Sequence, residues 1–302
     1  MNLKPCYWRS GGWTAVAYLP DFVFQKQGNS SVWLARKYAA SADAARIADA
    51  DGLFESPECE IVKDQRKIKV GRIRVSLGGE VRTLYVKRYN SFSWRMQLAS
   101  LFRDSGAVRA LRGAAVLLNA RIAAAKPVAA VESRFCGMVT KSFFLTEEIN
   151  DGKTVDAYWR DDLSTLAGRV GFRRRRGFLG ALASLFQSLH GQHVYHDDLK
   201  DANILVVPGS RAETDNFFLL DLEGIRNPPR LSERRRMKNL VQLNRTLGRY
   251  LGRAERLCFL KRYMGAACDD RRRRRLWAKK ILRRSSRLDR RKFAAGAAVV
   301  LT

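Results

Sequence analysis

The sequence predicts an α+β fold with two lobes, a small N-terminal lobe built on an antiparallel β-sheet and a mainly helical C-terminal lobe. Two observations predict it. From residue 58 onward, apolar and polar residues alternate in short runs, which is typical of strands that bury one face. Beyond residue 150, apolar residues recur every three or four positions, as in amphipathic helices. With 302 residues, 46% of them hydrophobic, the chain can fill a core in both lobes.

We divide the chain into residues 1–57, an N-terminal extension of the small lobe, residues 58–150, the small lobe with a hinge, and residues 151–302, the helical lobe. The extension shows strand-like residues at 13–24 and an Ala-rich, helix-like run at 39–50. No chemistry is evident in it. Its tryptophans are expected to pack in the core or at an edge, although a membrane interface is an alternative.

Three strands are expected early in the small lobe, joined in part by the turn Gly78-Gly79. They are Glu60–Lys63, Lys67–Leu77 and Thr83–Lys87. The apolar stretch Ala114–Val131 is expected to form a buried helix that ends before a proline.

In the helical lobe, residues 153–192 are expected to be helical. The apolar positions of one face are Phe178, Leu179, Leu182, Leu185, Phe186 and Leu189. After a turn at Pro228-Pro229, leucines 240, 243, 247 and 251 keep helical spacing between arginine-rich runs. This part is therefore expected to be folded.

The stretch from His190 to Asn203 carries the most specific pattern. Read from His196, it gives H-x-D-L-K-x-x-N, the spacing of the protein-kinase catalytic loop. In that loop the Asp, here Asp198, accepts the proton of the substrate hydroxyl, and the Asn, here Asn203, holds a metal ion. His190 and the histidine at 193 are expected to be structural, whereas His196 is expected to brace the loop.

A second metal-binding carboxylate follows the catalytic loop. The apolar run 217–220 reads as a strand that delivers Asp221. Phosphoryl transfer needs a carboxylate near the attacking hydroxyl and oxygen ligands for Mg²⁺. The order of loop, strand and Asp221 therefore predicts an ATP- and Mg²⁺-dependent kinase rather than a mere polar connection.

Lys87 stands at the end of an apolar strand, in Leu-Tyr-Val-Lys. This resembles the kinase Val-Ala-Ile-Lys strand, whose amine reaches the ATP phosphates. Two departures accompany it. The glycine-rich phosphate loop is absent, and basic residues at 63, 66, 67 and 69 occupy its place. No Glu follows on the next helix, so Asp104 is the expected substitute partner of Lys87.

Residues 137–149 read as a strand leading into a hinge, where adenine would bond to backbone groups near Glu147 and Ile149. The alternative is that Glu147 and its neighbour Glu148 are only solvated charges at a strand end.

The net charge is extreme. The 57 Lys and Arg exceed the 29 Asp and Glu by 28, which points to an anionic partner such as a membrane surface or nucleic acid. The five cysteines, at 6, 59, 136, 258 and 268, form no Cys-x-x-Cys pair, so a reducing cytoplasmic compartment is expected. Residues 1–13 lack the apolar core of a secretory signal, and no run of about 18 apolar residues occurs.

Together, these motifs resemble the bacterial lipopolysaccharide core kinase family, which includes heptose and 3-deoxy-D-manno-octulosonic acid kinases. The resemblance spans roughly residues 58–290 and includes Lys87, the loop 196–203, Asp221-Leu-Glu-Gly224 and the segments 238–244 and 260–263. It implies a protein-kinase-like fold and ATP-dependent phosphorylation of a sugar hydroxyl on the lipid-linked inner core.

The resemblance further implies a peripheral enzyme at the cytoplasmic face of the inner membrane. By carry-over, Asp198 is the base, Asn203 and Asp221 hold Mg²⁺, and Lys87 and Lys200 contact phosphates. Glu223 departs from the Asp-Phe-Gly form of kinases. It either adds a metal ligand or caps the following turn.

Three alternatives stay open. A pseudokinase or scaffold is suggested by the missing glycine loop. A kinase fold acting on a protein or small-molecule acceptor has the same motifs. A nucleic-acid-binding protein is suggested by the arginine runs, but only Trp277 and Phe293 interleave with those at the C-terminus, and binding would need more aromatic residues there.

Overall fold

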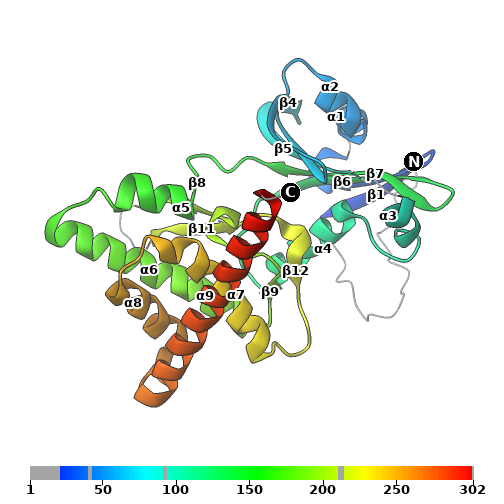
Figure 1. The fold of residues 1–302 in the computed structure, drawn as a ribbon. Coiled ribbons are helices and arrows are strands. Elements are labelled where there is room, and N and C mark those ends of the chain that lie inside the picture. The colour runs from blue at the N-terminus through cyan, green and yellow to red at the C-terminus, as the bar shows by residue number, and fades with distance from the viewer. Residues whose placement is uncertain (1–20, 40–42, 91–93, 210–213, 301–302) are drawn as a thin grey trace. The chain divides into compact units, whose positions relative to one another are not determined.

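The structure is a computed structural model that describes residues 21–39, 43–90, 94–209 and 214–300. The chain forms two compact units (Figure 1). Unit 1 comprises Met1–Val116, Ala125–Ile149 and Asp221–Ile225, and unit 2 comprises Leu117–Ala124, Asn150–Leu220 and Arg226–Thr302. After the small-lobe strands, the chain passes from unit 1 to unit 2 between Ile149 and Asn150. The hinge is expected at this point. Tryptophans 8 and 13 lie outside the described residues.

Unit 1 is built on a seven-stranded sheet with the order β1-β2-β6-β7-β5-β4-β3. Every neighbouring pair in it is antiparallel. The strands are β1 (Phe22–Gln27), β2 (Ser30–Ala35), β3 (Glu60–Gln65), β4 (Ile68–Leu77), β5 (Glu80–Asn90), β6 (Pro127–Phe135) and β7 (Met138–Glu147). The first two come from the expected extension and are part of the same sheet.

The three early strands are confirmed; β3 and β5 are longer than expected, and β4 starts one residue later. Gly78 and Gly79 form the turn between β4 and β5 with φ of 61° and 83°, a backbone conformation that glycine adopts without steric cost. Along β4, Ile73, Val75 and Leu77 alternate with more exposed residues and are at most 3% exposed. The sheet thus buries one set of side chains, as its period of two requires.

The buried helix expected within Ala114–Val131, ending before the proline, is confirmed. Helix α4 spans Gly106–Asn119, and β6 begins at Pro127. Residues 129–131 pair with β2 on one side and β7 on the other, and residues 128–131 are at most 2% exposed. A short apolar run of this kind has no period that separates strand from helix.

The helices of unit 1 lie against opposite faces of the sheet. They are α1 (Asp43–Ala48), α2 (Ala50–Glu55), α3 (Trp94–Ala99) and α4. Phe54 of α2 packs near Gly71 of β4 and Phe143 of β7. On the other face, Gly106 of α4 lies so close to the Tyr89 ring that an added Cβ would be 2.4 Å from it.

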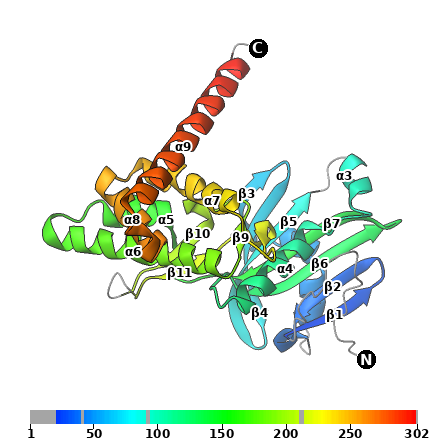
Figure 2. The same ribbon diagram turned by 90° about the horizontal axis from the view of Figure 1, so that it is seen from below.

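Unit 2 is mainly helical (Figure 2). Its helices are α5 (Val155–Tyr158), α6 (Gly168–Gly191), α7 (Glu233–Arg245), α8 (Arg253–Met264) and α9 (Arg271–Val300). A three-stranded sheet of order β11-β10-β8 joins them, with β8 (Lys153–Thr154), β10 (Ile204–Val207) and β11 (Asn216–Leu219). Among the described residues, no helix is long and apolar enough to cross a membrane.

The core of unit 2 follows the predicted face of α6. Five of its six expected positions are at most 1% exposed, namely Phe178, Leu179, Leu182, Phe186 and Leu189. Phe186 also packs edge-on against Phe259 of α8, with ring centroids 5.6 Å apart. This packing fixes α6, whose C-terminal end leads into the predicted catalytic loop.

Candidate active site

His196 braces the predicted catalytic loop in unit 2. The loop starts at β9 (Tyr195–His196) and ends in a 3₁₀ turn at Asp201–Asn203. The buried imidazole donates from Nε2 to the Leu220 carbonyl at 3.0 Å and accepts the Asp198 N–H on Nδ1 at 3.0 Å. These two bonds together require a neutral ring with its proton on Nε2. The expected bracing role is confirmed, and it ties the loop to the residue just before Asp221.

The Asp198 carboxylate is oriented from several sides and remains accessible. Lys200 Nζ lies 2.7 Å from its Oδ2, and Gln242 Nε2 lies 3.4 Å from its Oδ1. The Asn203 side-chain nitrogen donates to the Asp198 carbonyl at 2.8 Å and lies 3.3 Å from Oδ2. The carboxylate is 49% exposed. Such a group can accept a proton from a bound hydroxyl.

Two polar residues of α7 support the loop, although no motif in the sequence assigns them this role. Asn239 is fully buried and donates to the His196 carbonyl at 2.6 Å. Gln242 donates to the Asp197 carbonyl at 2.7 Å and accepts the Leu199 N–H at 3.3 Å. Their spacing of i and i+3, beside core leucines, was the available signal. Because buried amides need partners, these two fix the loop backbone.

His190 is structural, as expected. Its ring contacts the Tyr263 hydroxyl at 2.8 Å and the Asn239 side-chain oxygen at 3.3 Å. Burial lowers the pKa of His190 to about 4, because a charged imidazole would lose its hydration there. The neutral ring thus links α6, α7 and α8.

In unit 1, Lys87 lies in a cluster of charged groups on one face of the sheet. Its ammonium forms an ion pair with Asp221 and lies 3.8 Å from Glu223. It also lies 4.9 Å from the centre of the Tyr89 ring, within the range of a cation–π contact. Arg109 of α4 lies 3.3 Å from Glu223 on its other side.

The expected pairing of Lys87 with Asp104 is wrong. Asp104 forms an ion pair with Arg112, and its carbonyl accepts a hydrogen bond from Arg109 at 2.7 Å. The carboxylates facing Lys87 are instead those of Asp221 and Glu223, and helix α4 contributes a cation, Arg109. In a protein kinase the helix supplies a Glu that pairs with the strand lysine, whereas here the strand keeps its lysine and the helix presents an arginine.

Glu223 is largely enclosed in this cluster. Burial raises its pKa, and the nearby Asp221 charge acts in the same direction, whereas Lys87 and Arg109 oppose them. The two roles expected for Glu223, an added metal ligand or a cap of the following turn, stay predictions. Its carboxylate bridges the two cations.

Asp221 has a special backbone conformation, with φ 56° and ψ 52°. Left-handed backbone is uncommon outside glycine, is more frequent for Asp than for most residues, and often marks functional sites. The turn behind it, Leu222–Gly224, lies against α4 at Gly113, where an added Cβ would be 2.0 Å from the Leu222 carbonyl oxygen. Glycine at 113 therefore permits this close approach.

The two glutamates of the expected hinge are engaged in contacts. The Glu147 carboxylate accepts bonds from Lys37 and Tyr38 at 2.5 and 2.9 Å, and its N–H donates to the Lys126 carbonyl at 2.9 Å. Burial opposes ionisation, but the bonds from Lys37 and Tyr38 outweigh it and lower the pKa of Glu147. Glu147 is therefore not merely a solvated charge at the end of a strand.

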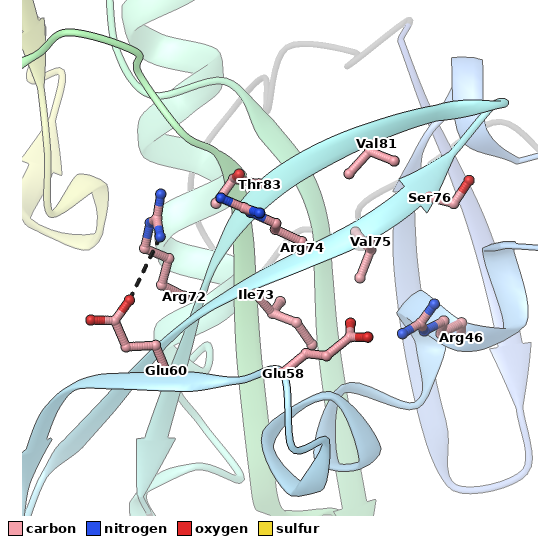
Figure 3. Close-up of a pocket in the computed structure, with 10 residues that line it drawn as sticks. All are labelled: Arg46, Glu58, Glu60, Arg72, Ile73, Arg74, Val75, Ser76, Val81 and Thr83. Carbon is pink, nitrogen blue, oxygen red and sulfur yellow. Dashed lines mark ion pairs between the residues drawn. The ribbon is translucent and has the colours of Figure 1, made fainter.

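Glu148 pairs with Arg72 of β4 through bonds of 2.8 and 3.0 Å, which lower the pKa of the carboxyl. Arg72 also borders a pocket of about 600 Å³ in unit 1. Figure 3 shows Arg72 and Glu60 pointing toward one another in this pocket, 3.6 Å apart. None of the predicted site residues lines it.

The structure therefore brings the predicted residues together in two groups. Asp198, Lys200 and Asn203 meet in unit 2. Lys87 and Asp221 meet in unit 1. The expected adenine contacts, backbone groups near Glu147 and Ile149, lie at the end of the β7 segment of unit 1.

The model of the lipopolysaccharide kinase (Kdo/WaaP) family matches residues 56–263. This range includes both groups of predicted residues and more than half of the chain. The chain belongs to the lipopolysaccharide kinase family. It is therefore a phosphotransferase, and the predicted family is confirmed.

The fold agrees with that of a solved family member. A structure described as WaaP in complex with acyl carrier protein is similar, with a TM-score of 0.58 and 19% identity, over 82% of this chain and 97% of that chain. Comparison with the curated proteins gives no match. The predicted kinase-like α+β fold is thus confirmed.

Asn203 in unit 2 and Asp221 in unit 1 each carry an oxygen donor of the kind that Mg²⁺ prefers. The Asn203 amide nitrogen is bonded to Asp198, which leaves Oδ1 as the atom of that side chain able to coordinate. Asp221 offers a carboxylate. Among the described residues, no three His, Cys, Asp or Glu side chains gather as a metal cage. One or two protein oxygens together with substrate phosphates are the usual protein environment of Mg²⁺.

Proposed function

We propose that this lipopolysaccharide kinase transfers the terminal phosphoryl group of ATP to a sugar hydroxyl of the lipopolysaccharide inner core. The observation that carries the proposal is the Asp198 carboxylate, which is held by Lys200 and Asn203 and still half exposed. A carboxylate so fixed can take the proton of an attacking hydroxyl.

The other residues have roles that follow from their chemistry. Asn203 and Asp221 would hold Mg²⁺, which neutralises charge on the phosphates when bound. Lys87 and Lys200 would contact phosphate oxygens, because each presents an ammonium beside a proposed carboxylate or amide of the site. Adenine would bond to backbone groups near Glu147 and Ile149. Since the Glu147 N–H already has a partner, its carbonyl and Ile149 are the groups proposed for this contact.

A matched pair of variants tests the base. Asp198→Asn should lower kcat by about 10²–10⁴-fold, the usual contribution of general acid–base catalysis. Asp197→Asn is the control, because this neighbouring carboxylate is 48% exposed and pairs only loosely with Arg226 and Lys238, both at 3.6 Å. It should retain most of the activity. Equal losses in the two variants would contradict the assignment.

The acceptor is tested in cells. Mass spectrometry of lipopolysaccharide from a deletion strain should show the loss of one core phosphate, and wild-type protein but not Asp198→Asn should restore it. An unchanged core would argue for a protein or small-molecule acceptor. If the purified chain neither binds nor hydrolyses Mg²⁺–ATP, the pseudokinase alternative is correct.

We also propose that the enzyme binds peripherally to the cytoplasmic face of the inner membrane. The supporting observation is the formal net charge of +28, since basic residues near an anionic leaflet contribute about 1 kcal/mol each. Salt screens this attraction. Washing membranes with high salt should therefore release the protein, and its retention after salt and carbonate washes would refute peripheral binding.

A further inference from the structure

The hairpin of β3 and β4 occupies the place of the kinase glycine-rich loop. In protein kinases, the backbone of that loop covers the ATP phosphates. Here Gln65 pairs with Ile68, so the connection is a two-residue turn of Arg66 and Lys67. This turn offers no series of glycine N–H groups. Other positively charged groups would therefore have to bind the ATP phosphates.

The strand register shows which basic side chain could supply it. Lys63 of β3 is opposite Val70 of β4, and Val70 is opposite Lys87 of β5. Directly opposite residues of antiparallel strands project to the same face of a sheet. Lys63 therefore lies on the face of Lys87, two strands away.

The side chains of the next set of paired residues project to the opposite face of the sheet. Asp64 is opposite Lys69, and Lys69 is opposite Arg88. Lys69 lies 5.8 Å from the centre of the Phe54 ring, and Arg88 lies 3.6 Å from Asp51, so both face α2. The hairpin thus carries two lysines of equal charge on opposite faces of one sheet.

Reach and availability favour Lys63. Strands are spaced by about 4.8 Å, so the backbones of residues two strands apart are about 10 Å from one another. Each four-carbon lysine stem extends about 6 Å, so two such side chains can contact one polyphosphate. Lys63 is exposed, and among the described residues it forms no ion pair, whereas Lys69 lies 3.7 Å from Asp64.

We propose that Lys63 replaces the glycine-rich loop as the cover of the nucleotide phosphates. Its ammonium binds phosphate oxygens from the β3 side, while Lys87 binds them from β5. A lysine can serve because its charge, rather than a particular backbone shape, neutralises the phosphate oxygens. The inference rests on the proposed use of ATP and adds a residue to that site.

Calorimetric titration of the purified full chain with ATP, ADP and adenosine tests the proposal. Lys63→Ala should weaken ATP binding about tenfold, the scale of one charge-assisted contact, and leave adenosine binding unchanged. Lys63→Arg should keep most of the ATP affinity. Lys69→Ala, which makes the same change of net charge on the other face, should bind ATP as the wild type does.

The outcomes separate this inference from the proposed function. If wild-type protein binds ATP and Lys63→Ala binds it equally well, the role of Lys63 is refuted and the kinase proposal stands. Equal losses in Lys63→Ala and Lys69→Ala would also refute it, since only general charge would matter. Failure of the wild type to bind ATP would overturn both. Thermal melting of each variant identifies a loss of affinity that arises from unfolding.

Discussion

Gly113 offers a sharp test of how α4 holds the segment that carries Asp221. Alanine in a helix interior is normally favoured over glycine by about 1 kcal/mol. At this position, however, the new Cβ would be 2.0 Å from the Leu222 carbonyl oxygen and 3.1 Å from the Ile225 Cβ. A backbone oxygen cannot rotate away, so α4 or the turn must shift.

Overpacking of this kind costs typically about 1–3 kcal/mol. Because the contact is so short, we expect the upper end, and after the gain in helix propensity a net destabilisation of about 2 kcal/mol. That corresponds to a fall in Tm of about 4–8 °C for a unit of this size. ATP affinity should fall as well, since the displaced turn carries Asp221 and Glu223.

Gly180→Ala is the matched control. Gly180 lies within α6, and a Cβ there would meet nothing within 4 Å. This variant should gain about 1 kcal/mol, a rise in Tm of about 2–4 °C, without affecting activity. Thermal melting of both variants with and without ATP gives the comparison. If Gly113→Ala is as stable as Gly180→Ala, the close approach of α4 to Leu222 is not a feature of the folded protein.

Three further predictions concern polar contacts of the two units. Asn239→Ala should destabilise unit 2 by about 1–3 kcal/mol, because it leaves buried groups without partners, and urea titration should show it together with a lower kcat. Because burial lowers the pKa of His190 from 6.5 to about 4, its contribution to stability should be fully present above pH 6.5. As the pH falls toward 4, this contribution of about 3 kcal/mol should be lost. In urea titrations at several pH values, His190→Gln should make the dependence of the unfolding free energy on pH less steep. Glu223→Gln keeps the shape of the side chain but removes the charge facing Lys87, so KM for ATP should rise several-fold, and an unchanged KM would contradict a positioning role.

Local patterns in the sequence were sufficient to predict how the loop from His196 to Asn203 is held together. The residues from His196 to Asn203 are held partly by bonds among themselves, such as those of Asp198 with His196 and Asn203. Their spacing therefore specifies a geometry as well as a composition. The same holds for the turn at Gly78-Gly79 and for the buried face of α6, where the side-chain period defines the face.

Contacts between segments that are far apart in the sequence could not be predicted from local patterns. The strand at 128–131 is decided by pairing with β2 and β7, because a short apolar run suits a strand and a helix equally. Asn239 and Gln242 acquire their role only when α7 packs beneath the loop. Their spacing beside core leucines does not by itself reveal which loop they support.

By itself, the sequence determined the kinase family and the α+β class, and it predicted the loop residues Asp198 and Asn203. Only the tertiary structure decided that Lys87 faces Asp221 and Glu223 rather than Asp104. The physical reason is that an ion pair forms between whichever charges packing brings within about 4 Å. Separation along the chain says little about that distance once strands and helices have folded against one another.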